Sequence, residues 1–213
     1  MRQMIVVGTA LLCVIAAMAG GGEPGIRLQA NKDGVFEYVE DFSTPRFLAE
    51  AFATNIPADS WTKGLLGNRG PNRYRMLTYR FFGGRAIEKI DIRIDQRANA
   101  RNLGGGSQLF VSPNGLDWAL VAESKRQPAD ENGWQKQPFV LTGEQAAPLR
   151  GSSEAWMRLV LDNWTGLKTA PASIIDSLRV TIRVGEPVTT DDPQAPLRAQ
   201  WAQLRQQTGW RSI

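Results

Sequence analysis

A regular alternation of apolar and polar residues constrains the fold of this chain more than any other feature of its sequence. Aliphatic residues at the even positions of 178–184 alternate with arginine and threonine, and three isoleucines in 90–95 alternate with charged residues. A period of two is expected of a β-strand with one face buried and the other in water. Both segments therefore predict half-buried strands.

Six further segments carry a β pattern, and clusters of glycine, proline, asparagine and aspartate separate them. They are 35–42, 73–82, 108–111, 118–121, 139–141 and 156–162. No long helical pattern lies between them, so we expect an all-β antiparallel sandwich over 35–185 rather than a parallel βαβ sheet. An earlier stretch, 45–55, fits either a short helix or an extended crossing.

The N-terminus has the pattern of a secretory signal peptide. One arginine precedes a run of apolar or small residues at 4–18, and Ala17-Met18-Ala19 forms a small-residue cleavage site. We expect cleavage after Ala19 and a flexible lead-in over 20–34, with an uncleaved membrane anchor as the alternative. The predicted location is secreted, periplasmic or in the cell envelope, and the membrane is a partner only through the signal peptide before cleavage.

Two scarce residue types exclude several chemistries. The chain has no histidine, which excludes Ser-His-Asp triads and histidine-ligated metals, and its one cysteine, Cys13, lies inside the predicted signal peptide. The mature domain would hold together without disulfides. The net charge of +4 is spread along the chain, so no nucleic-acid partner is expected.

The C-terminal segment 186–213 is predicted to be a linker and an amphipathic helix. Asp192 and Pro193 suit the N-cap and the first helical position. The apolar stripe consists of Leu197, Trp201 and Leu204. Such a stripe packs back on the sandwich or contacts another protein of the envelope, and the sequence leaves both open.

A tight hairpin is predicted at 112–118, where Asn114-Gly115 lies between two strand patterns. The string LFVSPNGLDWALV resembles the strand-turn-strand of discoidin-like, galactose-binding-like jelly rolls, although Asn114 stands where those patterns usually have aspartate. Within those families the hairpin is mostly a folding element.

The two ends of the domain extend this resemblance. YVEDFST at 38–44 and IIDSLRVTIRV at 174–184 are similar to the first and last strands of secreted jelly-roll sandwiches of the concanavalin-like and carbohydrate-binding-module kind. The likeness covers roughly 35–184. It implies an antiparallel jelly-roll sandwich and a glycan ligand.

The same resemblance implies a structural calcium ion that joins the first and last strands. Glu40, Asp41 and Asp176 are its candidate ligands, because calcium prefers oxygen donors. The alternative, that these are solvated strand-end acids or turn caps, carries equal weight.

Candidate ligand-binding residues come from aromatic and arginine positions that face away from the core. In 156–162 the alternation places Trp156, Arg158 and Asp162 opposite the apolar face, while Trp134 and Trp164 fall in expected turns. An aromatic plane beside a planar donor fork and an acceptor suits a sugar ring. Each tryptophan also has a structural alternative in the core.

Catalysis is not expected. The carboxylate motif E-x-D-x-x-E of concanavalin-like glucanases is missing from the sequence, and no catalytic residue can be named. The sequence thus favours an exported, non-catalytic sandwich that binds carbohydrate or another extracellular ligand. A structural or protein-interaction domain of the cell envelope is the alternative, and a glycosidase is less favoured.

Overall fold

The computed structural model describes residues 25–56, 61–62, 65–67, 74–99, 106–124, 134–162 and 173–187. The predicted signal peptide, Trp164 and the predicted C-terminal helix lie outside these residues. Within them, no helix has the length and apolar character needed to cross a membrane.

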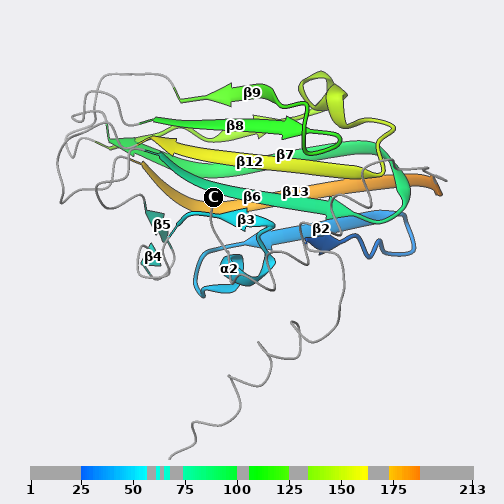
Figure 1. Ribbon diagram of the computed structural model, residues 1–213, viewed down its shortest axis with the longest axis horizontal. Coiled ribbons are helices and arrows are strands. Elements are labelled where there is room, and N and C mark those ends of the chain that lie inside the picture. The colour runs from blue at the N-terminus through cyan, green and yellow to red at the C-terminus, as the bar shows by residue number, and fades with distance from the viewer. Residues whose placement is uncertain are drawn as a thin grey trace, which may run out of the picture.

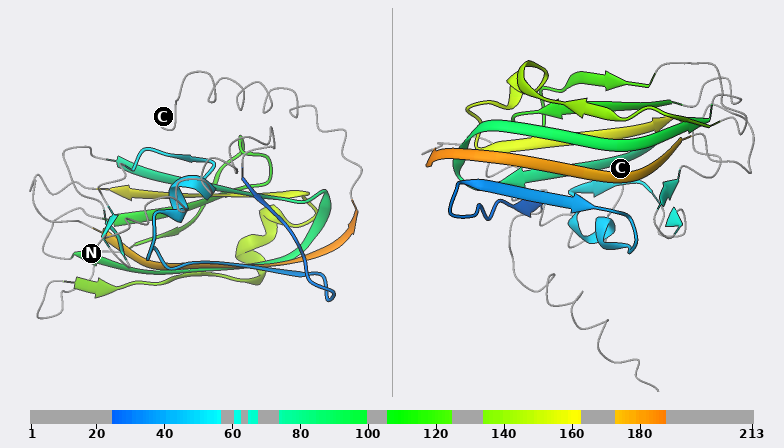
Figure 2. Two further views of the ribbon diagram at one scale, coloured as in Figure 1. Left: turned by 90° about the horizontal axis from the view of Figure 1, so that it is seen from below. Right: turned by 180° about the vertical axis from the view of Figure 1, so that it is seen from behind.

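Two β-sheets are stacked face to face (Figures 1 and 2). The first, here called sheet A, has the strand order β1-β6-β12-β8-β9, and β3 also pairs with β6. Its strands are β1 (Ile26–Arg27), β3 (Ala53–Thr54), β6 (Tyr74–Phe82), β8 (Gly106–Ser112), β9 (Ala119–Glu123) and β12 (Glu154–Asp162).

The second sheet, sheet B, has the order β10-β7-β13-β5-β4, with β11 also on β7 and β2 also on β13. Its strands are β2 (Val35–Glu40), β4 (Trp61–Thr62), β5 (Leu65–Gly67), β7 (Arg85–Asn99), β10 (Trp134–Lys136), β11 (Phe139–Leu141) and β13 (Ser173–Pro187). All the pairings in sheet B are antiparallel.

The chain crosses repeatedly between the sheets. It passes from sheet A to sheet B between β6 and β7, returns at β8, crosses again after β9, and crosses twice more around β12. Repeated crossing between two packed antiparallel sheets is the pattern of a jelly roll. The predicted all-β jelly-roll sandwich is thereby confirmed.

The core lies between the inner faces of the two sheets, and the predicted alternation decides which residues enter it. The even positions of 178–182 and 90–94 are all 2% exposed or less. Tyr79 and Phe81 supply aromatic rings from the inner face of sheet A, and both rings contact Tyr38 of β2 in sheet B. Burial of such faces is the main favourable contribution to folding.

Short helices complete the two layers. The segment 45–55 contains α2 (Arg46–Glu50) and then β3, so the short-helix interpretation holds, and Phe47 is fully buried. The 3-10 helix η2 (Gly143–Leu149) lies between β11 and β12 and buries Leu149. Both helices thus lie in chain segments that connect one sheet to the other (Figure 1).

Part of the expected lead-in belongs to the sheet. Residues 26–27 form β1, which pairs in parallel with Phe81 and Phe82 of β6. The backbone N–H of Leu28 extends the contact by donating to the carbonyl of Phe82. The two-residue strand is too short to show a period of two, so the sequence pattern could not indicate it.

Candidate functional site

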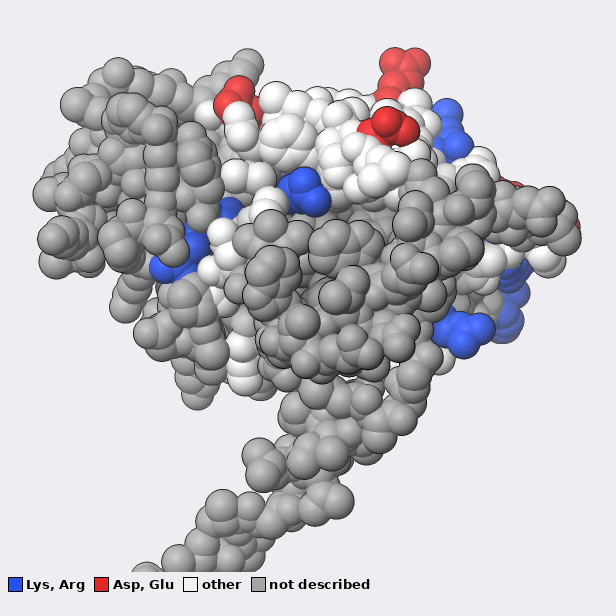
Figure 3. Space-filling view, viewed as in Figure 1, with Lys and Arg blue, Asp and Glu red and all other residues white. Residues whose placement is uncertain are grey.

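The outer face of sheet A carries the candidate site. Arg158 of β12 lies directly between Thr78 of β6 and Phe110 of β8, and Phe110 in turn lies opposite Leu120 of β9. Directly paired residues point to the same side of a sheet, so these side chains share one surface. Figure 3 looks onto this face, which is mainly uncharged over the part that the structure describes.

Arg158 and Trp118 form the centre of this surface. The guanidinium carbon of Arg158 lies 3.9 Å from the centroid of the Trp118 ring, and its Nε donates to the hydroxyl of Thr78 at 3.2 Å. The indole N–H of Trp118 donates to the carbonyl of Gly115 at 3.0 Å. Stacking and hydrogen bonds therefore hold both side chains in place.

The remaining donors of Arg158 meet no acceptor in the part of the chain that the structure describes. Its terminal nitrogens have no hydrogen-bond partner and form no ion pair among the residues that the structure describes. Partial burial lowers the pKa of this guanidinium from its usual value, although an arginine remains charged at neutral pH. A positioned, half-buried donor fork beside an aromatic ring can bind a hydroxyl or carboxylate of a ligand.

The predicted hairpin at 112–118 positions Trp118. The hydroxyl of Ser112 accepts the N–H of Gly115 at 2.9 Å, and the side-chain carbonyl of Asn114 accepts the N–H groups of Leu116 and Asp117 at 2.9 and 3.0 Å. Gly115 has a φ of 78°, which suits glycine. β8 and β9 pair antiparallel on either side of this turn, so the predicted hairpin is present, but its loop spans 113–118, only Gly115 of the Asn-Gly pair has a positive φ, and the return strand begins at Ala119.

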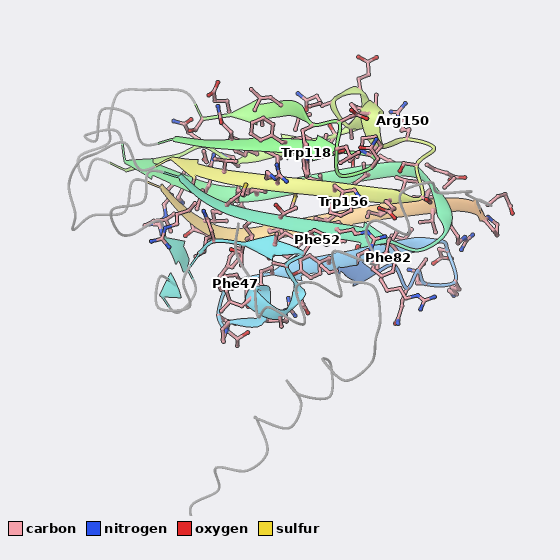
Figure 4. The ribbon with its side chains drawn as sticks, in the orientation of Figure 1. Phe47, Phe52, Phe82, Trp118, Arg150 and Trp156 are labelled. Atoms are coloured by element: carbon pink, nitrogen blue, oxygen red, sulfur yellow. The ribbon has the colours of Figure 1, made fainter. Side chains whose placement is uncertain are left out.

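Trp156 lies on the predicted outer face but is only 4% exposed. The Phe52 ring meets it edge-on at a centroid distance of 4.6 Å, and a Cβ at Gly115 would lie 3.0 Å from the Trp156 ring. The hairpin backbone and Phe52 thus cover it (Figure 4). The open stacking ring that we expected of Trp156 is not present, and Trp118 has the more accessible ring.

An ion pair lies next to Trp156. Arg80 of β6 donates two hydrogen bonds to the carboxylate of Glu154, from Nε at 3.1 Å and Nη2 at 2.6 Å. The indole N–H of Trp156 donates to the same carboxylate at 2.8 Å. Arg80 is only 1% exposed, so Glu154 neutralises a charge that water does not reach.

Of the other predicted ligand-binding tryptophans, the structure places the backbone of Trp134 only. Trp134 was expected in a turn, but it begins β10 and pairs with Asn99 of β7 in sheet B. A strand forms there because β7 runs to Asn99 and offers a free edge. Asp162 ends β12 opposite Tyr74, and its side chain, like all of Trp164, lies outside what the structure describes.

The three candidate calcium ligands have separate partners. Glu40 is 1% exposed and accepts the N–H of Phe42 at 2.8 Å, and Asp176 accepts two hydrogen bonds from Arg97 at 3.0 and 2.8 Å. Asp41 accepts the N–H of Ser43 at 2.9 Å, and hydrogen bonds from the Ser43 hydroxyl and backbone N–H lower the pKa of this exposed carboxyl. No group of three metal-ligating side chains forms among the described residues, so the predicted calcium set is not brought together.

This arrangement predicts that calcium leaves the stability unchanged. The carboxylate of Asp176 accepts hydrogen bonds from Arg97. The carboxylate of Glu40 accepts the N–H of Phe42 in the turn after β2 and forms an ion pair with Arg46. We expect the same melting temperature with calcium and with a chelator in differential scanning calorimetry. A higher melting temperature with calcium would contradict these pairings.

A second polar cluster joins β2 to α2. The hydroxyl of Tyr38 donates to Glu50 at 2.8 Å, and Nε of Arg46 lies 3.3 Å from a carboxylate oxygen of both Glu40 and Glu50. Burial raises the pKa of Tyr38 well above its usual value. Because Arg46 bridges both carboxylates, the cluster suits an attachment of α2 to the sheet better than acid–base catalysis.

Sequence reasoning missed Trp118 as a site residue. It was interpreted only as the start of the return strand after the hairpin. What brings it to the site is the pairing of β8 with β12, which places the end of the 112–118 hairpin over the strand that carries Arg158. The local sequence does not show this pairing. Without that pairing, the two residues are simply 40 positions apart.

No protein-family model matches the chain, and no curated protein matches it. Among solved structures, it is similar to the xylan-binding module CBM15 (9% identity over 70% of this chain and 95% of the module, TM-score 0.38). It is also similar to a family 35 carbohydrate binding module from an environmental isolate (16% identity, 65% of this chain and 90% of the module, TM-score 0.34). A third match is a mutant of Xylanase10C from Cellvibrio japonicus in complex with xylopentaose (8% identity, TM-score 0.36). It covers 55% of this chain and 22% of the xylanase. Since these TM-scores lie below 0.5, the assignment to an all-β jelly-roll sandwich rests on the topology of the two sheets.

Proposed function

We propose that this chain is an exported, non-catalytic module that binds carbohydrate through the outer face of sheet A. The observation that carries the proposal is the Arg158 guanidinium stacked on Trp118, with its terminal donors unused among the described residues. Export is proposed from the predicted signal peptide, and the lack of catalysis from the absence of histidine and of a carboxylate motif.

The chemistry of this surface suits a sugar ring. A sugar offers hydroxyl acceptors at its edge and apolar C–H groups on its faces, so it needs donors next to apolar surface. Arg158 supplies the donors, and the half-exposed rings of Trp118 and Phe110 supply the surface. Gln108 on the same face of β8 adds an amide near Glu123, to which it donates at 2.6 Å.

The proposal predicts that Arg158→Gln weakens glycan binding without unfolding the protein. The protein is first screened on a glycan array, and the affinity for the best neutral oligosaccharide is then measured by isothermal titration calorimetry. We expect R158Q and Trp118→Ala each to weaken binding tenfold or more, because two charge-assisted hydrogen bonds and a ring contact are lost. R150Q, at an exposed arginine beside η2, is the matched control and should bind normally.

Two results would contradict the proposal. One is a full array without any bound glycan, and the other is glycan binding that R158Q and W118A leave unchanged. The melting temperature of R158Q is measured in parallel, because a normal value assigns the loss of binding to the surface rather than to folding.

A protein-interaction role in the cell envelope is the second candidate. It is favoured by two leucines near the same surface, Leu116 in the hairpin and Leu120 on β9, which are 64% and 48% exposed. Exposed large apolar side chains are common at protein interfaces. A partner captured by the wild type and lost in a Leu116→Ser/Leu120→Ser variant, with glycan binding retained, would identify this role.

A further inference from the structure

The outer face of sheet B presents rows of charged side chains across three strands. Arg93 of β7 lies directly opposite Arg179 of β13, and two positions along, Asp91 lies opposite Thr181. Two positions further, Lys89 lies opposite Arg183. The right-hand view of Figure 2 shows β7, β13 and β2 in the foreground of this face.

Two of these rows place like charges side by side. Directly opposed residues of an antiparallel pair have Cβ atoms only about 5 Å apart, and like charges there are destabilising. Arg93 and Lys89 each have an acidic partner on their own strand, Asp95 and Asp91. These partners offset the charges of Arg93 and Lys89, and each row keeps a second cation, Arg179 or Arg183, directly opposite.

Arg179 and Arg183 have unused charges. Both are exposed, and neither forms an ion pair among the residues that the structure describes. The acids closest to them along β7 are already paired. They therefore offer free guanidinium groups, about 13 Å apart at four residues of strand rise, to an external anion.

The row between the two cationic rows carries carboxylates instead of cations. It consists of Asp91, Thr181 and Glu37, the last of which lies opposite Thr181 on β2. The two carboxylates repel anions, while Glu37 and Thr181 can accept hydrogen bonds from hydroxyls; Asp91 pairs with Lys89 through one oxygen and has the other buried. A ligand that fits all three rows carries anionic groups at intervals, with hydroxyl-bearing neutral units between them.

Exposed valines border the first cationic row. Val39 of β2 lies opposite Arg179 and is 44% exposed, and Val140 of β11 lies opposite Arg93 and is 46% exposed. They add small apolar surfaces on both sides of the two arginines, which suit the C–H groups of a sugar.

We infer that the outer face of sheet B binds an acidic polysaccharide in which anionic sugars alternate with neutral ones. A nucleic acid fits less well, because its closely spaced phosphates would also lie over the row of Asp91 and Glu37. This site is separate from the one proposed on sheet A, and the two have different ligands.

The test uses hyaluronan oligosaccharides, which carry one carboxylate on every second sugar, with dextran and single-stranded DNA of similar length as comparisons. We expect hyaluronan to bind, more weakly as salt increases, and Arg179→Gln/Arg183→Gln to reduce its affinity tenfold or more. R27Q/R150Q is the control, because it removes the same charge from exposed positions outside sheet B and should bind normally.

Three results would overturn the inference: no binding of hyaluronan, equal binding of the DNA, or equal loss in the control variant. A lower melting temperature of R179Q/R183Q would also overturn it, because the argument from repulsion expects an equal or higher one. The R158Q variant should still bind hyaluronan, and R179Q/R183Q should still bind a neutral glycan. Failure of one site is thus distinguishable from failure of the other.

Discussion

Replacing Glu154 by leucine should lower the free energy of unfolding by about 3 kcal/mol, because it leaves the buried charge of Arg80 without its carboxylate. Arg80 is 1% exposed and donates two hydrogen bonds to Glu154. The same substitution removes the acceptor of the Trp156 indole N–H. Urea unfolding followed by circular dichroism measures the change.

A double variant distinguishes loss of the ion pair from loss of packing as the cause of the lower stability of E154L. Arg80→Met/Glu154→Leu removes both charges, and we expect it to recover most of the stability, since a buried ion pair is often replaceable by apolar side chains. Glu123→Leu, at an exposed position of the same sheet, should change the stability little. If the double variant is no more stable than E154L alone, the loss of the Glu154 carboxylate beside Arg80 is not the cause.

The fold was predictable because the alternation of period two reports directly which residues enter the core. It placed the even positions of 90–94 and 178–182 inside, and each of them is buried. The boundaries were harder to predict. β7 begins at Arg85 and runs to Asn99, well beyond the alternating segment, because β13 pairs with it on both sides of that segment and β10 pairs with its end.

The candidate site was predictable only in part. Strand parity placed Trp156 and Arg158 on the outer face, as the structure has them. It could not show that Phe52, about a hundred positions earlier, and the backbone of Gly115 cover Trp156, because both contacts depend on how strands pair across the sheet.

The carboxylates show the same limit of sequence reasoning. Asp176 precedes the alternating segment 178–184, where the resemblance implies a calcium ligand, but the structure places it inside β13, at an irregularity in the pairing with β7. Its role depends on Arg97, which β7 brings alongside. Glu40 is used by the turn at Phe42 and by Arg46 of α2. Whether an acid binds a metal or an arginine is decided by the neighbouring strand, which the local sequence does not contain.

The hairpin at 112–118 gives the second large effect, and the chain contains a matched control for it. Gly115 and Gly151 both have a φ of 78°, but a Cβ at Gly115 would lie 3.0 to 3.1 Å from three atoms of the Trp156 ring, whereas a Cβ at Gly151 would have no neighbour within 4 Å. Alanine at either position therefore has the same backbone strain, and only alanine at position 115 also collides with the Trp156 ring.

We expect Gly151→Ala to cost about 1 kcal/mol through its backbone conformation and Gly115→Ala about 2–4 kcal/mol through conformation and overpacking together. The ring contact should disappear when Trp156 is replaced by leucine, so the added cost of G115A should shrink in that background. Urea unfolding of the single and double variants forms the cycle. Equal costs of G115A and G151A would mean that the hairpin moves to accommodate the added Cβ without a loss of stability.

The glycine variants also test the proposed binding surface, because the Gly115 carbonyl accepts the indole N–H of Trp118. A displaced hairpin should then weaken glycan binding in G115A while G151A binds normally.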